Sequence, residues 1–180
     1  MKDDKLKKET DQLKKDIFSD DWDLIKSAAG RLIEIGGDEI VDFFISLLAL
    51  DNPNIRNMAA LALHDLKDNR AVEPLLKAIF KQENHQKNGT MVYALEELDC
   101  STKLKEIFQI LFYQTWESKQ SAYSILSSQV FTFISDDLLE IKNSWDDIKS
   151  YPEKCPGYDD VKTREMIQNA VEGYMEYLNA

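Results

Sequence analysis

The chain has 180 residues, 43 % of them hydrophobic and 31 % charged, which is typical of a folded domain and excludes a largely disordered chain. Its net charge of −11 disfavours nucleic acid as a partner, because affinity for phosphate backbones depends on clustered Lys and Arg. The sequence contains no run of about 18 apolar residues, and its charged start lacks the apolar stretch of a secretory signal. We therefore expect no membrane contact and a cytoplasmic location.

The first segment is dominated by charged residues around a narrow apolar stripe. Within residues 2–18, Leu6, Leu13 and Ile17 fall on one side of a helix, and Lys and Asp residues occupy the other. This pattern predicts a helix over residues 1–19 that caps the structure behind it. A disordered charged arm is the alternative.

The middle of the chain repeats one unit, a pair of apolar helices, at a step of 31 or 32 residues. Ala28 and Leu32 recur 31 residues later as Ala59 and Leu63, and Leu63 recurs 32 residues later as Leu95. One helix pair cannot bury its apolar face alone, so a period of this length indicates a stacked helical array. A fourth, more divergent unit is expected to begin near Trp116 and to extend through a helix that starts at residues 135–137.

Polar turns mark the expected ends of the helices. Asp20 or Asp21 can cap the first helix of the first unit, and Gly36-Gly37 can end it. Residues 84–89 form a polar linker before the third unit. Residues 150–159 read as a loop, after which Asp159 or Asp160 can cap a final amphipathic helix.

The second unit resembles HEAT repeats, in particular the short bacterial, lyase-type HEAT-like repeats. The likeness is carried by Ile55-Arg56, by Ala59-Ala60-Leu61, and by the stretch from Asp68 to Leu76 with its Ala-Val and Pro-Leu pairs. It covers about residues 20–145 and is clearest in the second unit.

Periodicity and resemblance together predict one all-α domain over residues 1–180, a short right-handed α-solenoid of about four helix pairs. The pairs occupy residues 20–149, after the capping helix of residues 1–19 and before the loop and C-terminal capping helix of residues 150–180. The resemblance further implies that the second helix of each unit lines a concave face. Polar positions there, with two aromatic residues between the third and fourth units, make up the candidate partner-binding set: Asp38, Asp42, Glu73, Lys77, Glu106, Gln109, Tyr113, Trp116, Asp136 and Glu140.

Residue patterns that support catalysis or metal binding are missing from the sequence. His64 and His85 are not spaced as metal ligands and belong to no His-Glu pair, and Cys100 and Cys155 form no Cys-x-x-Cys motif. The six glycines form no phosphate-binding loop. We therefore predict no catalytic, cofactor-binding or metal-binding residues, and a protein that is not an enzyme.

The three tryptophans, Trp22, Trp116 and Trp145, recur near the boundaries of units. Packing in the core is the favoured interpretation. The alternative is an exposed aromatic patch beside acidic residues, which suits a basic partner.

These features favour a protein-binding scaffold that uses an acidic concave surface, such as an inhibitor or immunity-type protein for a basic partner. One alternative is an enzyme that resembles the alkylpurine DNA glycosylases built from HEAT-like repeats, although the basic stripe of those enzymes is missing. The other is an accessory of bilin attachment that resembles the phycobilin lyases, and only the repeat type supports it.

Overall fold

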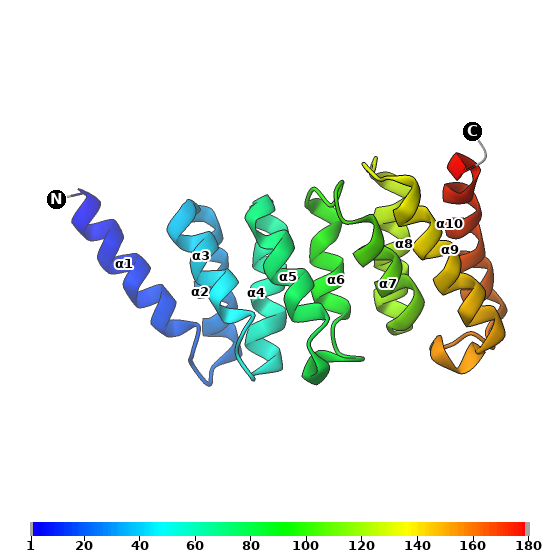
Figure 1. Cartoon of the computed structure of the whole chain (residues 1–180). Helices are drawn as coiled ribbons and strands as arrows, with labels where there is room; N and C mark the ends of the chain where they lie inside the picture. Colours follow the sequence, from blue (N-terminus) through cyan, green and yellow to red (C-terminus); the bar gives the residue numbers. More distant parts are fainter. Residues whose placement is uncertain (1, 179–180) are drawn as a thin grey trace.

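The computed structural model describes residues 2–178, and within this range the chain forms an elongated array of α-helices without strands (Figure 1). Met1 and residues 179–180, which the predicted capping segments include, lie outside the described residues. Residues 2–16 and residues 161–178 lie at opposite ends of the array (Figure 1). The helices are α1 (Lys2–Asp16), α2 (Trp22–Ile35), α3 (Asp38–Leu47), α4 (Pro53–Leu66), α5 (Val72–Ile79), α6 (Gly89–Ala94), α7 (Leu104–Tyr113), α8 (Trp116–Ser128), α9 (Ser135–Ser150) and α10 (Val161–Met175).

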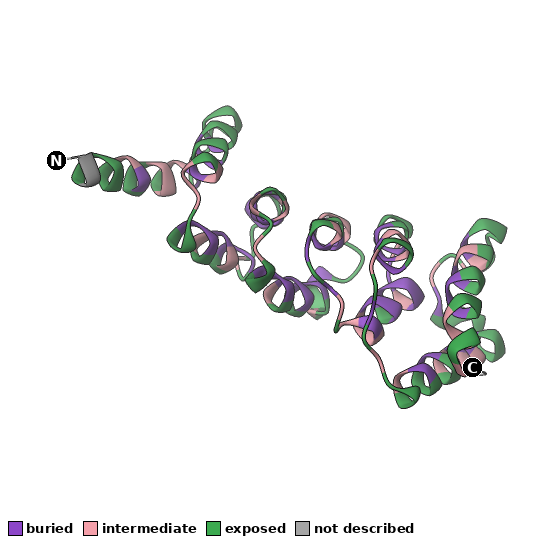
Figure 2. Cartoon of the chain, turned by 90° about the horizontal axis from the view of Figure 1, so that it is seen from above, coloured by how far each residue is buried: buried purple, intermediate pink, exposed green. Residues whose placement is uncertain are grey.

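The helices form two rows, seen from above in Figure 2. In the first row α2 packs on α4, α4 on α6, α6 on α8, and α8 on α10. The second row consists of α3, α5, α7 and α9, and the first three of these pack against the first-row helices that follow them. Within residues 2–178 the chain thus forms four helix pairs between a first helix, α1, and a last helix, α10, which confirms the predicted all-α solenoid.

Local sequence explains where the helices begin and end. The carboxylate of Asp21 accepts hydrogen bonds from the amides of Asp23 and Leu24, at 2.9 and 3.4 Å, and so caps α2. Gly36 ends α2 with φ of 61°, a left-handed conformation that costs glycine little. At the other end of the chain Asp160, one of the two predicted caps, accepts from the amide of Thr163 at 2.8 Å and starts α10.

A single apolar core runs the whole length of the array between the two rows. The repeat register is visible in four equivalent leucines, Leu32, Leu63, Leu95 and Leu126, all of which are buried. Ala28 and Ala59 are also buried, and their small side chains allow neighbouring helices to approach closely. Each unit therefore completes the core of the next, which is why the helix pairs need to stack.

The fourth helix pair has a long second helix and an extended connection before it. Helix α9 starts at Ser135, within the predicted start, and continues to Ser150, because Trp145 and Ile148 extend its buried stripe. The chain between α8 and α9 is extended, and Gln129 fixes it to the preceding repeat: its amide donates to the carbonyl of Leu98 at 2.9 Å and accepts from the amide of Cys100 at 2.9 Å. Across residues 2–178 we find no helix whose length and apolar character would let it cross a membrane.

Candidate protein-binding surface

Most of the predicted binding residues lie on the second row of helices. Asp38 and Asp42 belong to α3, Glu73 to α5, Glu106 to α7, and α9 carries the last two acidic candidates. The acidic side chains therefore recur from one unit to the next along this row. We call the outward surface of α3, α5, α7 and α9 the second-row face.

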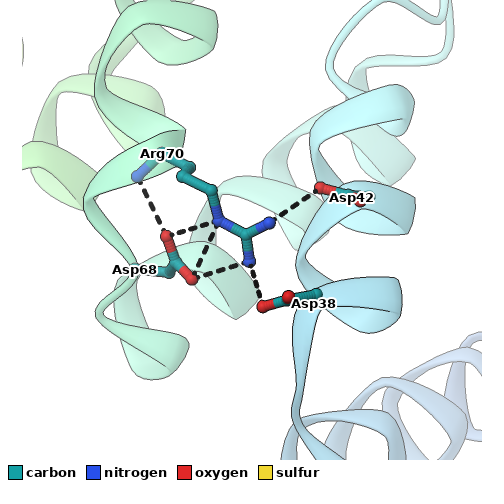
Figure 3. A network of polar contacts seen from close by, with 4 residues as sticks. All are labelled: Asp38, Asp42, Asp68 and Arg70. Atoms are coloured by element: carbon teal, nitrogen blue, oxygen red, sulfur yellow. Dashed lines mark hydrogen bonds and ion pairs between the residues drawn. The ribbon is translucent and has the colours of Figure 1, made fainter.

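Arg70, in the turn before α5, ties two of these carboxylates to the next repeat (Figure 3). One terminal nitrogen, Nη2, lies 2.9 Å from Asp38, and the other, Nη1, lies 3.3 Å from Asp42. The guanidinium also holds Asp68 of its own turn, through Nε and Nη2 at 3.0 and 2.9 Å. The hydrogen bonds from Arg70 lower the pKa of Asp68, and Asp68 in turn raises the pKa of Arg70.

Similar ion pairs join α1 to the second row and the later helices of that row to one another, and we call the whole set the junction ladder. Lys14 of α1 lies 2.6 Å from Glu39 of α3, and its hydrogen bond lowers the pKa of that carboxyl. The remaining pairs join Lys103, just before α7, to Glu73 of α5, and Lys105 of α7 to Asp137 and Glu140 of α9 at 3.1 and 3.0 Å. Cations of one repeat thus orient carboxylates of its neighbour.

The paired carboxylates stay accessible to a partner. The side chain of Asp38 is 90 % exposed, that of Glu73 72 % and that of Glu140 67 %. Glu106 and Asp136 have no cation within 4 Å in the part of the chain that the structure describes. The second-row face therefore carries both ion-paired carboxylates and carboxylates without a direct ion pair.

The four candidates that are not acidic do not all lie exposed on the second-row face. Lys77 and Gln109 are exposed on the same row, but Tyr113 at the end of α7 is partly buried and packs edge-to-face on Phe112 with ring centroids 5.9 Å apart. Trp116 begins α8, in the first row, and its side chain is exposed. Trp116 therefore lies away from the second-row face, and Tyr113 lies at the end of a second-row helix with its ring partly covered.

Only one of the tryptophans follows the favoured interpretation. Trp145 is buried and stacks on Phe112 at 6.3 Å, whereas Trp22 and Trp116 are both exposed. Core packing was the wrong expectation for these two, because each is the first residue of its helix, where one side of the ring faces solvent.

Both thiols and the imidazole of His64 are engaged in packing, whereas His85 is exposed. Cys100 is buried, and burial raises the pKa of its thiol to about 12, so it carries almost no thiolate near neutral pH. His64 stacks on Tyr93 with ring centroids 4.7 Å apart, and its Nδ1 lies 3.0 Å from Asp65. Within the described residues, no three His, Cys, Asp or Glu side chains are grouped so that they could hold a metal ion.

Two features escaped the sequence analysis. Lys119 of α8 is buried, and its ammonium donates to the carbonyls of Leu111 and Phe112 at 2.7 and 2.8 Å, with Cys155 Sγ 3.5 Å away. Nothing in the sequence distinguishes this lysine from a solvated one. The second feature is a groove of about 480 Å³ between α8, residues 129–134 and α10. The alternation of Phe131 and Phe133 was its one sequence signal.

Comparison with known proteins agrees with this architecture. No curated protein matches the chain, but the family model of HEAT repeats matches residues 10–96, from α1 to the end of the first helix of the third pair. The helices after residue 96 continue the same stacking. HEAT repeats form helical scaffolds that mediate protein interactions, and residues 10–96 of this chain match that family.

Proposed function

We propose that the protein is a non-enzymatic binding module whose second-row face binds a protein partner with a basic surface. An inhibitor or immunity-type protein that masks such a partner is the specific form that we favour. The observation that carries this proposal is the row of carboxylates on successive repeats, oriented by the junction ladder and still exposed.

The charge distribution supports a basic partner. Residues 19–51, which contain α2 and α3, hold eight carboxylates and two cations, and thus a net charge of −6. A field of this sign accelerates the approach of a positively charged protein. The junction ladder also reduces the cost of ordering side chains on binding, because several carboxylates are already held in place.

The proposed binding relies on the negative charge of the second-row face and does not require that this face be concave. Consecutive first-row helices from α2 to α8 pack directly on one another, whereas α3, α5 and α7 pack mainly on the first row. Helices approach most closely on a concave side, so this packing does not favour the second row as the concave face. A basic partner can bind an oriented acidic row on either kind of surface.

Binding of a fluorescently labelled deca-arginine peptide, measured by anisotropy at low and high salt, tests the proposal. The variant Glu106→Gln/Asp136→Asn removes two unpaired charges from the second-row face without breaking the ladder. Its control, Asp11→Asn/Asp20→Asn, removes two charges near α1. We expect the first variant to bind at least fivefold more weakly and the control to stay within twofold of the original protein.

Two results contradict the proposal. If the original protein does not bind the peptide at low salt, its acidic face is no site for basic groups. If both double variants lose affinity equally, only net charge matters. Duplex DNA serves as the competitor, and preferential binding of DNA would favour the nucleic-acid alternative.

A further inference from the structure

The groove between α8, residues 129–134 and α10 is walled by aromatic rings from segments far apart in the sequence. Phe133 and Tyr177 lie edge-to-face with centroids 5.5 Å apart, and Phe133 meets Tyr174 in the same way at 5.9 Å. Tyr123 of α8 also lines the groove. The rings are inclined to one another by about 70°, so the groove presents ring faces in several directions.

These rings surround an accessible space that is not filled by the chain. Tyr177 is 63 % exposed and Val130, at the rim, is 90 % exposed. Tyr174 is already fixed, because its hydroxyl donates to the carbonyl of Leu126 at 3.1 Å. An exposed apolar surface of this kind, held by rigid neighbours, is characteristic of a contact site.

Gly173 lies at the groove in the last turn of α10, where glycine still has a lower helix propensity than alanine. Its close neighbours do not require a glycine, since a Cβ placed there would meet no atom within 4 Å. The missing side chain therefore leaves open space beside the rings at a cost to helix stability.

The polar groups of the groove narrow the choice of occupant. None of the residues that line it is charged. Gln129 is already bonded to the preceding repeat, but Ser127 and Asn169 supply a hydroxyl and an amide oxygen that can accept hydrogen bonds. Glu172 and Glu176 flank Gly173 and Tyr177 along the last turns of the chain, and residues 150–180 have a net charge of −3, from three cations and six carboxylates. The groove thus combines ring faces, acceptors and negative surroundings.

We propose that this aromatic groove binds an arginine side chain of the basic partner, and this inference rests on the proposed function. A guanidinium is planar, stacks on aromatic faces, and carries five N–H donors that need acceptors. An uncharged proline-rich segment would leave the acceptors unused. A second copy of the chain would bring its own net charge of −11 toward a negative surface.

The test is a variant that fills the groove without harming the fold. In Gly173→Leu a side chain enters the open space beside Tyr177. Its control is Gly30→Leu, because Gly30 is also a helical glycine, in α2, with no atom within 4 Å of a built Cβ. A second variant, Tyr177→Leu, removes the most exposed ring. Thermal melts of all three proteins verify that they are folded.

Anisotropy with the deca-arginine peptide, a deca-lysine peptide and a deca-proline peptide gives the readout. We expect Gly173→Leu and Tyr177→Leu to weaken binding of deca-arginine at least tenfold, Gly30→Leu to stay within twofold, and deca-lysine to bind more weakly than deca-arginine.

Several outcomes overturn the inference. If Gly173→Leu binds deca-arginine normally while Glu106→Gln/Asp136→Asn binds poorly, the groove is not the anchor but the proposed function stands. If the original protein binds neither basic peptide, the proposed function itself fails. Preference for deca-proline, or self-association that Gly173→Leu abolishes in sedimentation experiments, identifies a different occupant.

Discussion

Replacement of the buried Lys119 by methionine tests how the last repeats are held together. The ammonium supplies hydrogen bonds to two carbonyls at the C-terminal end of α7, Leu111 O and Phe112 O, which lie beyond the last hydrogen-bonded turn. Lys119→Met keeps most of the buried stem but leaves both carbonyls without this donor.

The expected loss of stability follows from those two contacts. Each buried carbonyl left without a partner costs about 1–3 kcal/mol. Burial lowers the pKa of Lys119, so the folded protein already bears a cost for the charged form, and removal of the ammonium recovers part of the loss. We therefore expect Lys119→Met to reduce the free energy of unfolding by about 2–4 kcal/mol.

Urea denaturation followed by circular dichroism measures this change, and Lys77→Met is the control. Lys77 is exposed on α5, so its replacement should change the free energy of unfolding by no more than about 0.5 kcal/mol. Lys119→Ala, which also opens a cavity, should cost about 2 kcal/mol more than Lys119→Met. If Lys119→Met is as stable as the original protein, the ammonium does not hold α7 and the reasoning is wrong.

Three further perturbations address other parts of the array. Asn88 is buried and makes three hydrogen bonds of 2.8–3.0 Å to α5, α8 and the turn before α8, so Asn88→Ala should lower the free energy of unfolding in urea by about 2–4 kcal/mol; a change below about 0.5 kcal/mol would contradict this. Gly30→Ala should raise the melting temperature, since it improves helix propensity by about 0.5–1 kcal/mol in open space. Burial raises the pKa of Cys100 from 9.0 to about 12, so the native state keeps a proton that the unfolded state loses. The contribution of Cys100 to the free energy of unfolding is therefore complete below about pH 9. It falls as the pH rises toward 12, and the unfolding constant increases by up to about tenfold per pH unit. An equally steep fall in the stability of Cys100→Ala would refute this assignment.

The sequence contained enough information for the architecture, because the signals involved are local or periodic. Helix periodicity needs only neighbouring residues, and the 31-residue step from Leu32 to Leu63 reports which faces meet when units stack. Caps such as Asp21 and Asp160 act within one turn, so they too could be read along the chain. The acidic candidates on the second helices came from the resemblance to HEAT repeats, which implied that these helices line one face, and not from the period.

Only the tertiary structure decided which charges are paired and which side chains are buried. Arg70 meets Asp38 and Asp42 across a repeat boundary, and no local pattern reports the direction of its side chain. Lys119 looks like any solvated lysine until α7 and the loop around Cys155 close over it. The aromatic groove likewise depends on packing of residues 129–134 beside α10, some forty residues further along the chain. Contacts of this kind depend on how the helices pack against one another. This packing is determined by the whole close-packed core and cannot be deduced from one segment of the chain.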